Sequence, residues 1–189
     1  VFHFHPVSFT LICGVQTSCY VMSVPFFTQF SVSNGTFTAF IAPAGVLTKA
    51  PGLIMKREPG LILYMCGNYP VILPDLSQFS DRFLVRRALT AFQILTILDE
   101  AYQSYLIFEF DRSLFEECTD LLPVIGHRCR EYAMNNAGVL LLSTYPDTYI
   151  QALEPFFHRI FLMQQIEAGS KPVKKKATSK QLSLDSLGV

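Results

Sequence analysis

The run YLIFEF, from Tyr105 to Phe110, decides the fold, because it is almost wholly apolar and has the length of a buried strand. Two runs of the same kind flank it, LILYMC at Leu61–Cys66 and GVLLLST at Gly138–Thr144. Helical patterns separate the three runs, at Asp81–Gln103 and at Ser113–Asn135. Buried strands that alternate with helices predict an α/β fold, with a mostly parallel sheet and helices on both faces.

The rest of the chain extends this pattern in both directions. We expect further strands at Phe9–Cys13, Phe37–Ile41 and Arg159–Ile166, a helix at Asp147–Phe157, a loop and then a helix between Gly14 and Phe30, and an irregular or hairpin-like segment at Pro43–Gly60. Within Ser113–Asn135, Pro123 and Gly126 are expected to break or kink the helix. The whole pattern predicts a single compact unit.

Length and composition bound the class of protein. The chain has 189 residues, of which 50% are hydrophobic and 16% charged, with a formal net charge of zero. These values exclude a strongly basic nucleic-acid-binding protein and a disordered chain. They predict one domain over residues 1–168 and a tail over residues 169–189 whose lysines are solvated or lie along nucleic-acid phosphates.

The segment before Lys49 raises the question of a membrane anchor. It contains no Asp, Glu, Lys or Arg, and Val7–Phe30 is apolar enough and long enough to span a bilayer. Polar residues interrupt the run and no basic residues precede it, which favours buried strand over signal or anchor. A membrane-anchored protein using residues 7–30 stays as an alternative, and a membrane partner is not expected.

Cysteine and histidine usage gives no metal site. The five cysteines form no CxxC pair, so we expect buried free thiols and a cytoplasmic protein. His3 and His5 share a strand face, but the sequence offers them no third ligand.

The first candidate site is the loop after Phe9–Cys13. Its sequence, GVQTSCYV from Gly14 to Val21, has the frame of the phosphate-binding GxxxxGK[ST] loop. Cys19, Tyr20 and Val21 replace the last glycine, the lysine that meets the phosphates and the hydroxyl that holds magnesium. We therefore interpret Gly14, Cys19, Tyr20 and Val21 as a degenerate phosphate loop.

Polar residues follow two of the buried runs. Glu109 and Asp111 end one of them, where a carboxylate could hold a magnesium-bound water. The alternative is that one of them caps a helix or pairs with a nearby arginine. Ser143 and Thr144 end the next run, where parallel sheets place groups that sense a ligand.

Three segments of the chain resemble a known protein family. Phe83–Glu100 (FLVRRALTAFQILTILDE) resembles the segment that precedes the Walker B strand in RecA/RadA-type recombinases and KaiC-like ATPases, through Arg87, Ala88, Thr90 and Gln93. Asp111–Phe115 (DRSLF) and Arg128–Thr144 (RCREYAMNNAGVLLLST) are similar to the stretches that follow that strand in the family.

The resemblance implies a RecA-like P-loop fold, with Glu109 or Asp111 as the Walker B-like carboxylate and Ser143 and Thr144 as sensor-like residues. The chain departs from the family in lacking the phosphate-loop lysine and hydroxyl, so neither ATP hydrolysis nor a resident cofactor is expected, and no catalytic residue is proposed. The alternative is a KaiC-like ATPase that binds ATP and magnesium through a displaced lysine, Lys49 or Lys56.

The tail carries a second resemblance. Lys180–Leu187 (KQLSLDSL) is similar to the archaeal sliding-clamp-binding motif, in which Gln181 and Leu184 fit, while Leu187 and Gly188 stand where aromatic residues belong. The two resemblances together imply a non-hydrolysing accessory module in DNA recombination or repair. Its implied partners are a recombinase-like subunit, single-stranded DNA and a sliding clamp.

Overall fold

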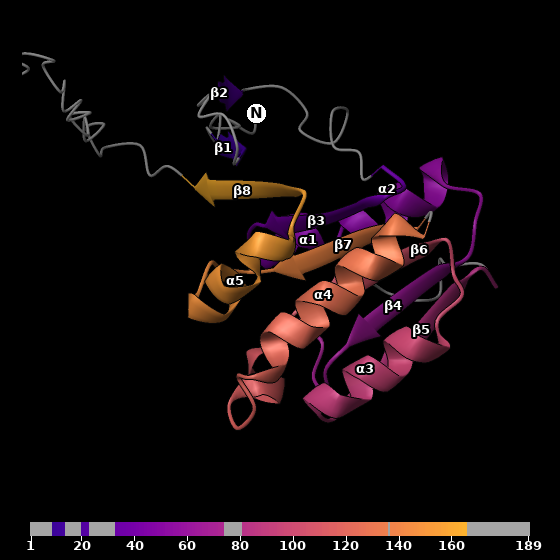
Figure 1. Ribbon diagram of the computed structural model, residues 1–189. Helices are drawn as coiled ribbons and strands as arrows, with labels where there is room; N and C mark the ends of the chain where they lie inside the picture. The colour runs from indigo at the N-terminus through magenta and orange to yellow at the C-terminus, as the bar shows by residue number, and fades with distance from the viewer. Residues whose placement is uncertain (1–8, 14–19, 23–32, 74–80, 136, 166–189) are drawn as a thin grey trace, which may run out of the picture.

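The computed structural model describes residues 9–13, 20–22, 33–73, 81–135 and 137–165 (Figure 1). The strands are β1 Phe9–Cys13, β2 Tyr20–Met22, β3 Thr36–Ile41, β4 Ile62–Cys66, β5 Phe83–Arg87, β6 Tyr105–Glu109, β7 Gly138–Ser143 and β8 Arg159–Gln165. The helices are α1 Ala44–Leu47, α2 Ala50–Arg57, α3 Ala91–Glu100, α4 Leu121–Met134 and α5 Thr148–Leu153, with short 3-10 helices η3 Arg112–Phe115 and η4 Glu154–Phe156.

The described strands form one sheet in the order β2-β1-β8-β3-β7-β6-β4-β5. The six strands from β8 to β5 in this order are all parallel, whereas β1 runs antiparallel to both β2 and β8. Every residue of β4, β6 and β7 is buried. These strands are covered on both faces, which explains why their residues are almost all apolar. The predicted α/β fold with a mostly parallel sheet is confirmed.

Two layers of helices cover the sheet, α3, α4 and α5 on one face and α1 and α2 on the other (Figure 1). Alternate residues of each strand supply the two cores. In β3, Phe37 joins the core under α3, α4 and α5, and Phe40 joins the core under α1 and α2. The chain therefore crosses from one face to the other as it passes along the sheet.

The helix predicted over Asp81–Gln103 is wrong in its first third. Phe83–Arg87 form β5, which pairs with β4 along its whole length. A polar cap then starts α3, since Thr90 Oγ1 accepts from the Gln93 backbone N–H at 3.3 Å and Gln93 Oε1 accepts from the Leu89 N–H at 2.6 Å. Pairing with a neighbouring strand thus outweighs the helical spacing of the apolar residues before Thr90.

The irregular or hairpin-like segment predicted at Pro43–Gly60 is also wrong, because it folds as α1 and α2. Pro43 is the N-cap residue of α1, and Pro51 lies in the first turn of α2. A proline there removes a backbone N–H that has no partner inside the helix, so these prolines start helices where breaks were expected.

The helix predicted over Ser113–Asn135 is wrong in its first third, where Arg112–Phe115 form η3 and α4 begins only at Leu121. The break predicted at Pro123 and Gly126 does not occur. α4 is continuous because Pro123 falls in its first turn. Gly126 packs against the ring of Phe156 and the side chain of Leu153, which belong to η4 and α5. The glycine therefore serves the packing of α5 and η4 on α4.

The N-terminal segment differs from the predicted strand, loop and helix. Tyr20–Met22 form a strand that pairs antiparallel with β1, so a helix there is wrong. Among the described residues, no helix is both long enough and apolar enough to cross a bilayer. The described parts of the 7–30 segment are thus strands at one side of the sheet.

Replacement of Gly126 tests the packing of α4. A Cβ at this position would lie 2.5 Å from Phe156 Cδ2 and 3.0 Å from Leu153 Cδ2, so Gly126→Val should lower the free energy of unfolding by about 1–3 kcal/mol. Gly52→Ala in α2 is the matched control, since nothing lies within 4 Å of its Cβ, and it should raise stability by about 0.5–1 kcal/mol. Urea unfolding measures both, and equal effects of the two variants would contradict this account.

Candidate functional site

The order of the strands places a switch point between β3 and β7. β3 is followed by α1 and α2 on one face and leads to β4, whereas β7 is followed by α5 on the other face and leads to β8. The two strands are neighbours, and the Ala42 N–H donates to the Ser143 carbonyl at 3.1 Å just past their ends. Open α/β sheets bind ligands outside the carboxyl ends of strands at such a point, so this edge is the candidate site.

The loop after β3 is the segment that would hold a phosphate here. The loop forms the short helix α1. Four consecutive backbone N–H groups, those of Val46, Leu47, Thr48 and Lys49, donate to carbonyls within Pro43–Val46. Leu47 is fully buried in the core under α1 and α2. Backbone donors already bonded in this way cannot form the cradle of free N–H groups that binds phosphate.

The same loop nevertheless has the spacing of the phosphate-binding motif, which sequence reasoning missed. In APAGVLTK, Ala42 and Leu47 stand at the two glycine positions, and Thr48-Lys49 stand where the motif has lysine and then Ser or Thr. The sequence did contain a signal for this loop, because the apolar run Phe37–Ile41 is followed by Thr48-Lys49 at the spacing of the motif. The position of β3 at the switch point makes this loop a better match to a phosphate-binding loop than the one after β1.

Glu109, at the end of β6, is held by three hydrogen bonds. Its carboxylate accepts from the Tyr64 hydroxyl at 2.6 Å and from the backbone N–H groups of Val71 and Ile72 at 2.5 and 2.8 Å. The residue is only 4% exposed. Both carboxylate oxygens accept hydrogen bonds from the protein, so Glu109 fastens the loop after β4 to the sheet.

Tyr64 is the buried partner in this arrangement. Burial first, and the Glu109 carboxylate second, raise the pKa of the Tyr64 hydroxyl far above its ordinary value. The hydroxyl therefore stays protonated and remains a donor to Glu109 throughout the physiological range of pH. The pair is a structural contact between β4 and the end of β6.

Asp111 serves a different purpose from Glu109. Its Oδ1 accepts from the backbone N–H of Ser113 at 3.0 Å and from the Ser113 hydroxyl at 2.7 Å, which caps η3. Its Oδ2 lies against Gly67, where an added Cβ would collide with it. Asp111 thus follows the capping alternative. Among the described residues, no three His, Cys, Asp or Glu side chains gather as a metal-binding group.

Ser143 and Thr144 lie at the switch point, as their place at the end of a buried run suggested. Ser143 is 5% exposed, and its hydroxyl donates to the Tyr145 carbonyl at 2.9 Å. Thr144 is half-buried. A sensing role for them stays a prediction.

β1, which precedes the predicted phosphate loop, does not end at this edge. β1 ends at Cys13 opposite Phe161, near the start of β8, so it points to the edge where the parallel strands begin. Tyr20 and Val21 lie in β2, while Gly14 and Cys19 fall outside the described residues. β1, which leads into the predicted phosphate loop, therefore ends at the opposite edge of the sheet from Glu109.

Three other sets of predicted residues lie outside the part of the chain that the structure describes: His3 and His5, the lysines of the tail, and the clamp-binding-like residues Gln181, Leu184 and Leu187. Cys19 lies outside it as well, whereas Cys13 is described by its backbone in β1. These remain predictions from the sequence.

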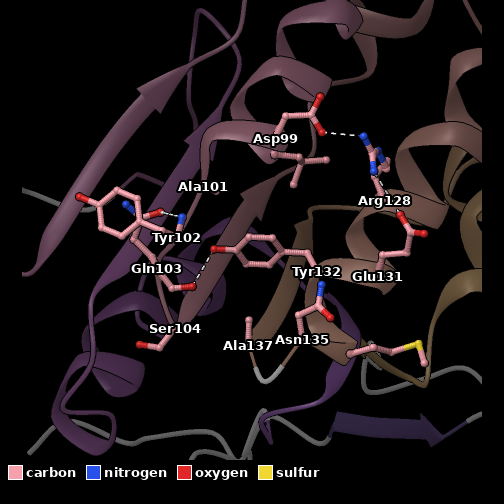
Figure 2. A pocket seen from close by; sticks show the side chains of 12 residues that line it. Asp99, Ala101, Tyr102, Gln103, Ser104, Arg128, Glu131, Tyr132, Asn135 and Ala137 are labelled. Carbon is pink, nitrogen blue, oxygen red and sulfur yellow. Dashed lines mark hydrogen bonds and ion pairs between the residues drawn. The ribbon is translucent and has the colours of Figure 1, made fainter.

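A cavity of about 790 Å³ opens at the other edge of the sheet (Figure 2). It lies between the last turns of α3 and α4, where β6 and β7 begin. No motif in the sequence indicated it, because its lining residues come from helix ends and short connections.

Comparison with known proteins adds a relative but no activity. No protein-family model matches the chain. The chain is 29% identical over 178 residues to an uncharacterized protein of Archaeoglobus fulgidus, an alignment that covers 89% of this chain and 83% of that protein.

Removal of the Glu109 carboxylate should destabilise the fold. Glu109→Ala leaves the Tyr64 hydroxyl and two backbone N–H groups without an acceptor, which costs about 3 kcal/mol or more of unfolding free energy. Glu109→Gln keeps an acceptor for the backbone groups and should cost about 1 kcal/mol. Urea unfolding, with hydrogen exchange at the Val71 and Ile72 amides, measures the difference. Equal losses in the two variants would contradict this account.

The thiols should differ in reactivity. Burial first, and Glu109 second, raise the pKa of Cys66 to about 11, and burial raises the pKa of Cys129 to about 12. Because the thiolate is the reactive form, iodoacetamide at pH 8 should alkylate the half-buried Cys118 well before these two in the native protein. Peptide mapping by mass spectrometry measures the order, and loss of the difference in urea is the control.

Proposed function

We propose that this chain is a non-hydrolysing RecA/RadA-like paralogue that acts as a binding or accessory module in DNA recombination or repair. The parallel sheet with helices on both faces is the architecture that a RecA-like domain requires. The resemblance at Phe83–Glu100 and Arg128–Thr144 supports the same family.

The engagement of Glu109 is the observation that carries the non-hydrolysing part. A Walker B-like carboxylate must reach magnesium, yet this one is 4% exposed and accepts three hydrogen bonds from the protein. The loop after β3 supports the same conclusion, since Leu47 is buried where a phosphate loop needs glycine. The edge keeps the topology of a nucleotide site and lacks its phosphate chemistry.

The family-like residues before β6 support the fold more than an activity. Thr90 and Gln93 make the cap of α3, and the Ala88 N–H donates to the Cys66 carbonyl at 2.8 Å. These contacts shape the connection between β5 and α3. A paralogue that lost catalysis would retain them, because the sheet depends on them.

The carboxyl edge also offers surface for a protein partner. Tyr69 and Val71, in the loop that Glu109 holds, are 83% and 70% exposed. Leu89 and Phe92, at the start of α3, are 60% and 64% exposed, and they follow the neighbouring strand β5. Exposed apolar groups of this size favour protein contact, and we propose a recombinase-like subunit in the cytoplasm as the partner. The tail would add single-stranded DNA and a sliding clamp.

One observation favours the alternative of a KaiC-like nucleotide-binding ATPase. Lys49 is exposed at the start of α2, in the connection that follows the carboxyl end of β3, which is where a displaced lysine would have to lie. Lys56 belongs to the last turn of α2 and so lies about 10 Å further along the helix. Lys49 is therefore the one to test.

Thermal unfolding with magnesium and ATP separates the two functions. A ligand that binds only the folded protein stabilises it by about 2.7 kcal/mol at a hundredfold excess over Kd. We expect no shift in Tm at millimolar ATP, for either the parent protein or Lys49→Ala. A shift that Lys49→Ala abolishes would show that nucleotide binds through Lys49, and release of phosphate from ATP by the same protein would overturn the non-hydrolysing proposal.

Binding assays test the partner part of the proposal. A RadA-type recombinase should bind the parent chain, and Tyr69→Ala with Phe92→Ala should weaken that binding at least tenfold without changing Tm, because both side chains are exposed. Glu116→Gln, an exposed substitution outside the loop after β4 and the start of α3, is the control. Absence of binding to both the recombinase and single-stranded DNA would contradict a role in recombination.

A further inference from the structure

The exposed apolar side chains at the carboxyl edge of the sheet lie on two neighbouring connections. The Ala88 N–H donates to the Cys66 carbonyl at 2.8 Å, so the chain after β5 and the chain after β4 leave the sheet side by side. Large apolar groups that gather in this way mark a contact surface. We call them the carboxyl-edge surface, and its members are Tyr69, Val71, Leu89 and Phe92.

The described chain ends at this same edge. β8 runs parallel to β3 and continues past Leu162, which pairs with Ile41 at the end of β3, to Gln165 (Figure 1). The strands β3, β7, β6 and β4 separate β8 from β5, which puts the two about 24 Å apart. The chain from Gln165 to Leu182 spans about 56 Å when extended, so residues after Leu182 reach the whole carboxyl-edge surface.

Unpaired charges follow a definite order along this edge. Three exposed acids, Glu116, Glu117 and Asp120, lie in the connection after β6. Exposed Arg87 ends β5, close in the chain to Leu89. None of these four charges forms an ion pair within the residues that the structure describes. Counted across the sheet from β8, the acids come first, and Arg87 comes last beside the apolar groups.

The sequence after Gln165 carries the complementary chemistry in the same order. SKPVKKKATSK, residues 170–180, contains five lysines and no acid. QLSLDSLGV, residues 181–189, contains four large apolar residues and one charge, Asp185. Lysines that start from β8 therefore meet the acids after β6, and the leucines and Asp185 meet the apolar groups and Arg87.

We propose that the segment Gln181–Val189 docks on the carboxyl-edge surface of its own chain. Its leucines pack against Tyr69 and Phe92, its Asp185 pairs with Arg87, and the lysines before it lie along the acids after β6. The inference rests on the proposed function in one respect, that a recombinase-like subunit competes for this surface. The segment also carries the clamp-binding-like motif, so its release frees the surface and the motif together.

Weak intrinsic affinity is sufficient for such a contact. A segment tethered by a short flexible linker has an effective concentration of about 1 mM. If the free peptide binds with a Kd of about 0.1 mM, the tethered segment occupies its surface about 90% of the time. It then raises the apparent Kd of a competing partner about tenfold, because only the open fraction is competent to bind.

Nuclear magnetic resonance of the full chain tests the contact directly. The variant replaces the three leucines of the segment by Ser, at Leu182, Leu184 and Leu187. Amide signals of the carboxyl-edge surface should differ between parent and variant, and added peptide KQLSLDSLGV should restore the parent signals. Signals of Tyr102, exposed at the other edge, should not move (Figure 2). Identical signals in parent and variant would overturn the proposal. A difference that grows with protein concentration would place the segment on a second copy and overturn the contact within one chain.

Substitutions on the surface identify where the peptide binds. In the three-leucine variant, Phe92→Ala, and separately Arg87→Gln, should each weaken binding of labelled KQLSLDSLGV at least fivefold by fluorescence anisotropy. Tyr102→Ala is the matched control, since this tyrosine is similarly exposed to Tyr69 but lies at the other edge, and it should leave Kd unchanged. Equal binding by all these proteins would overturn the proposed surface.

A recombinase assay separates this inference from the proposed function. A RadA-type recombinase should bind the three-leucine variant about tenfold more tightly than the parent chain. Equal affinities for the two would overturn the competition. Peptide binding together with no recombinase binding to either chain would support docking of the segment and contradict the proposed partner.

Discussion

Three central strands, β4, β6 and β7, are buried on both faces, and much of the structure follows from the need to cover them. A strand without a solvated face requires helices on both sides of the sheet. The chain meets this requirement by sending α1 and α2 to one face and α3, α4 and α5 to the other. The change of face puts β3 next to β7 with their connections leaving in opposite directions, which creates the switch point.

Burial also determines what happens to the acid at the end of β6. A carboxylate that is nearly inaccessible must be fully hydrogen-bonded, because an unsatisfied buried charge costs several kcal/mol. Tyr64, Val71 and Ile72 satisfy Glu109, and in doing so they hold the loop that displays Tyr69. The acid at the end of β6 thereby acts as an anchor for the loop after β4.

The two edges of the sheet have different chemistry. The carboxyl edge exposes large apolar side chains from the loop after β4 and from the start of α3. The amino edge collects the negative ends of two helices, two carboxylates and two tyrosines around a cavity. A parallel sheet separates helix starts from helix ends in this way, so that one small domain can present two unlike surfaces.

The sequence by itself determined the α/β class and the strands at 37–41, 61–66, 105–110, 138–144 and 159–166, each within a residue or so. It could do so because short, continuous apolar runs between turn residues are typical of buried strands. It misjudged Phe83–Arg87, whose helical spacing yielded to pairing with β4, and Pro43–Gly60, whose prolines start helices. Only the tertiary structure decided that β3 and not β1 borders the switch point, that Glu109 is engaged while Asp111 caps η3, and that a cavity opens beside Gln103. Each of these depends on contacts between residues far apart in the chain, and the order of strands in a sheet leaves no local pattern in the sequence.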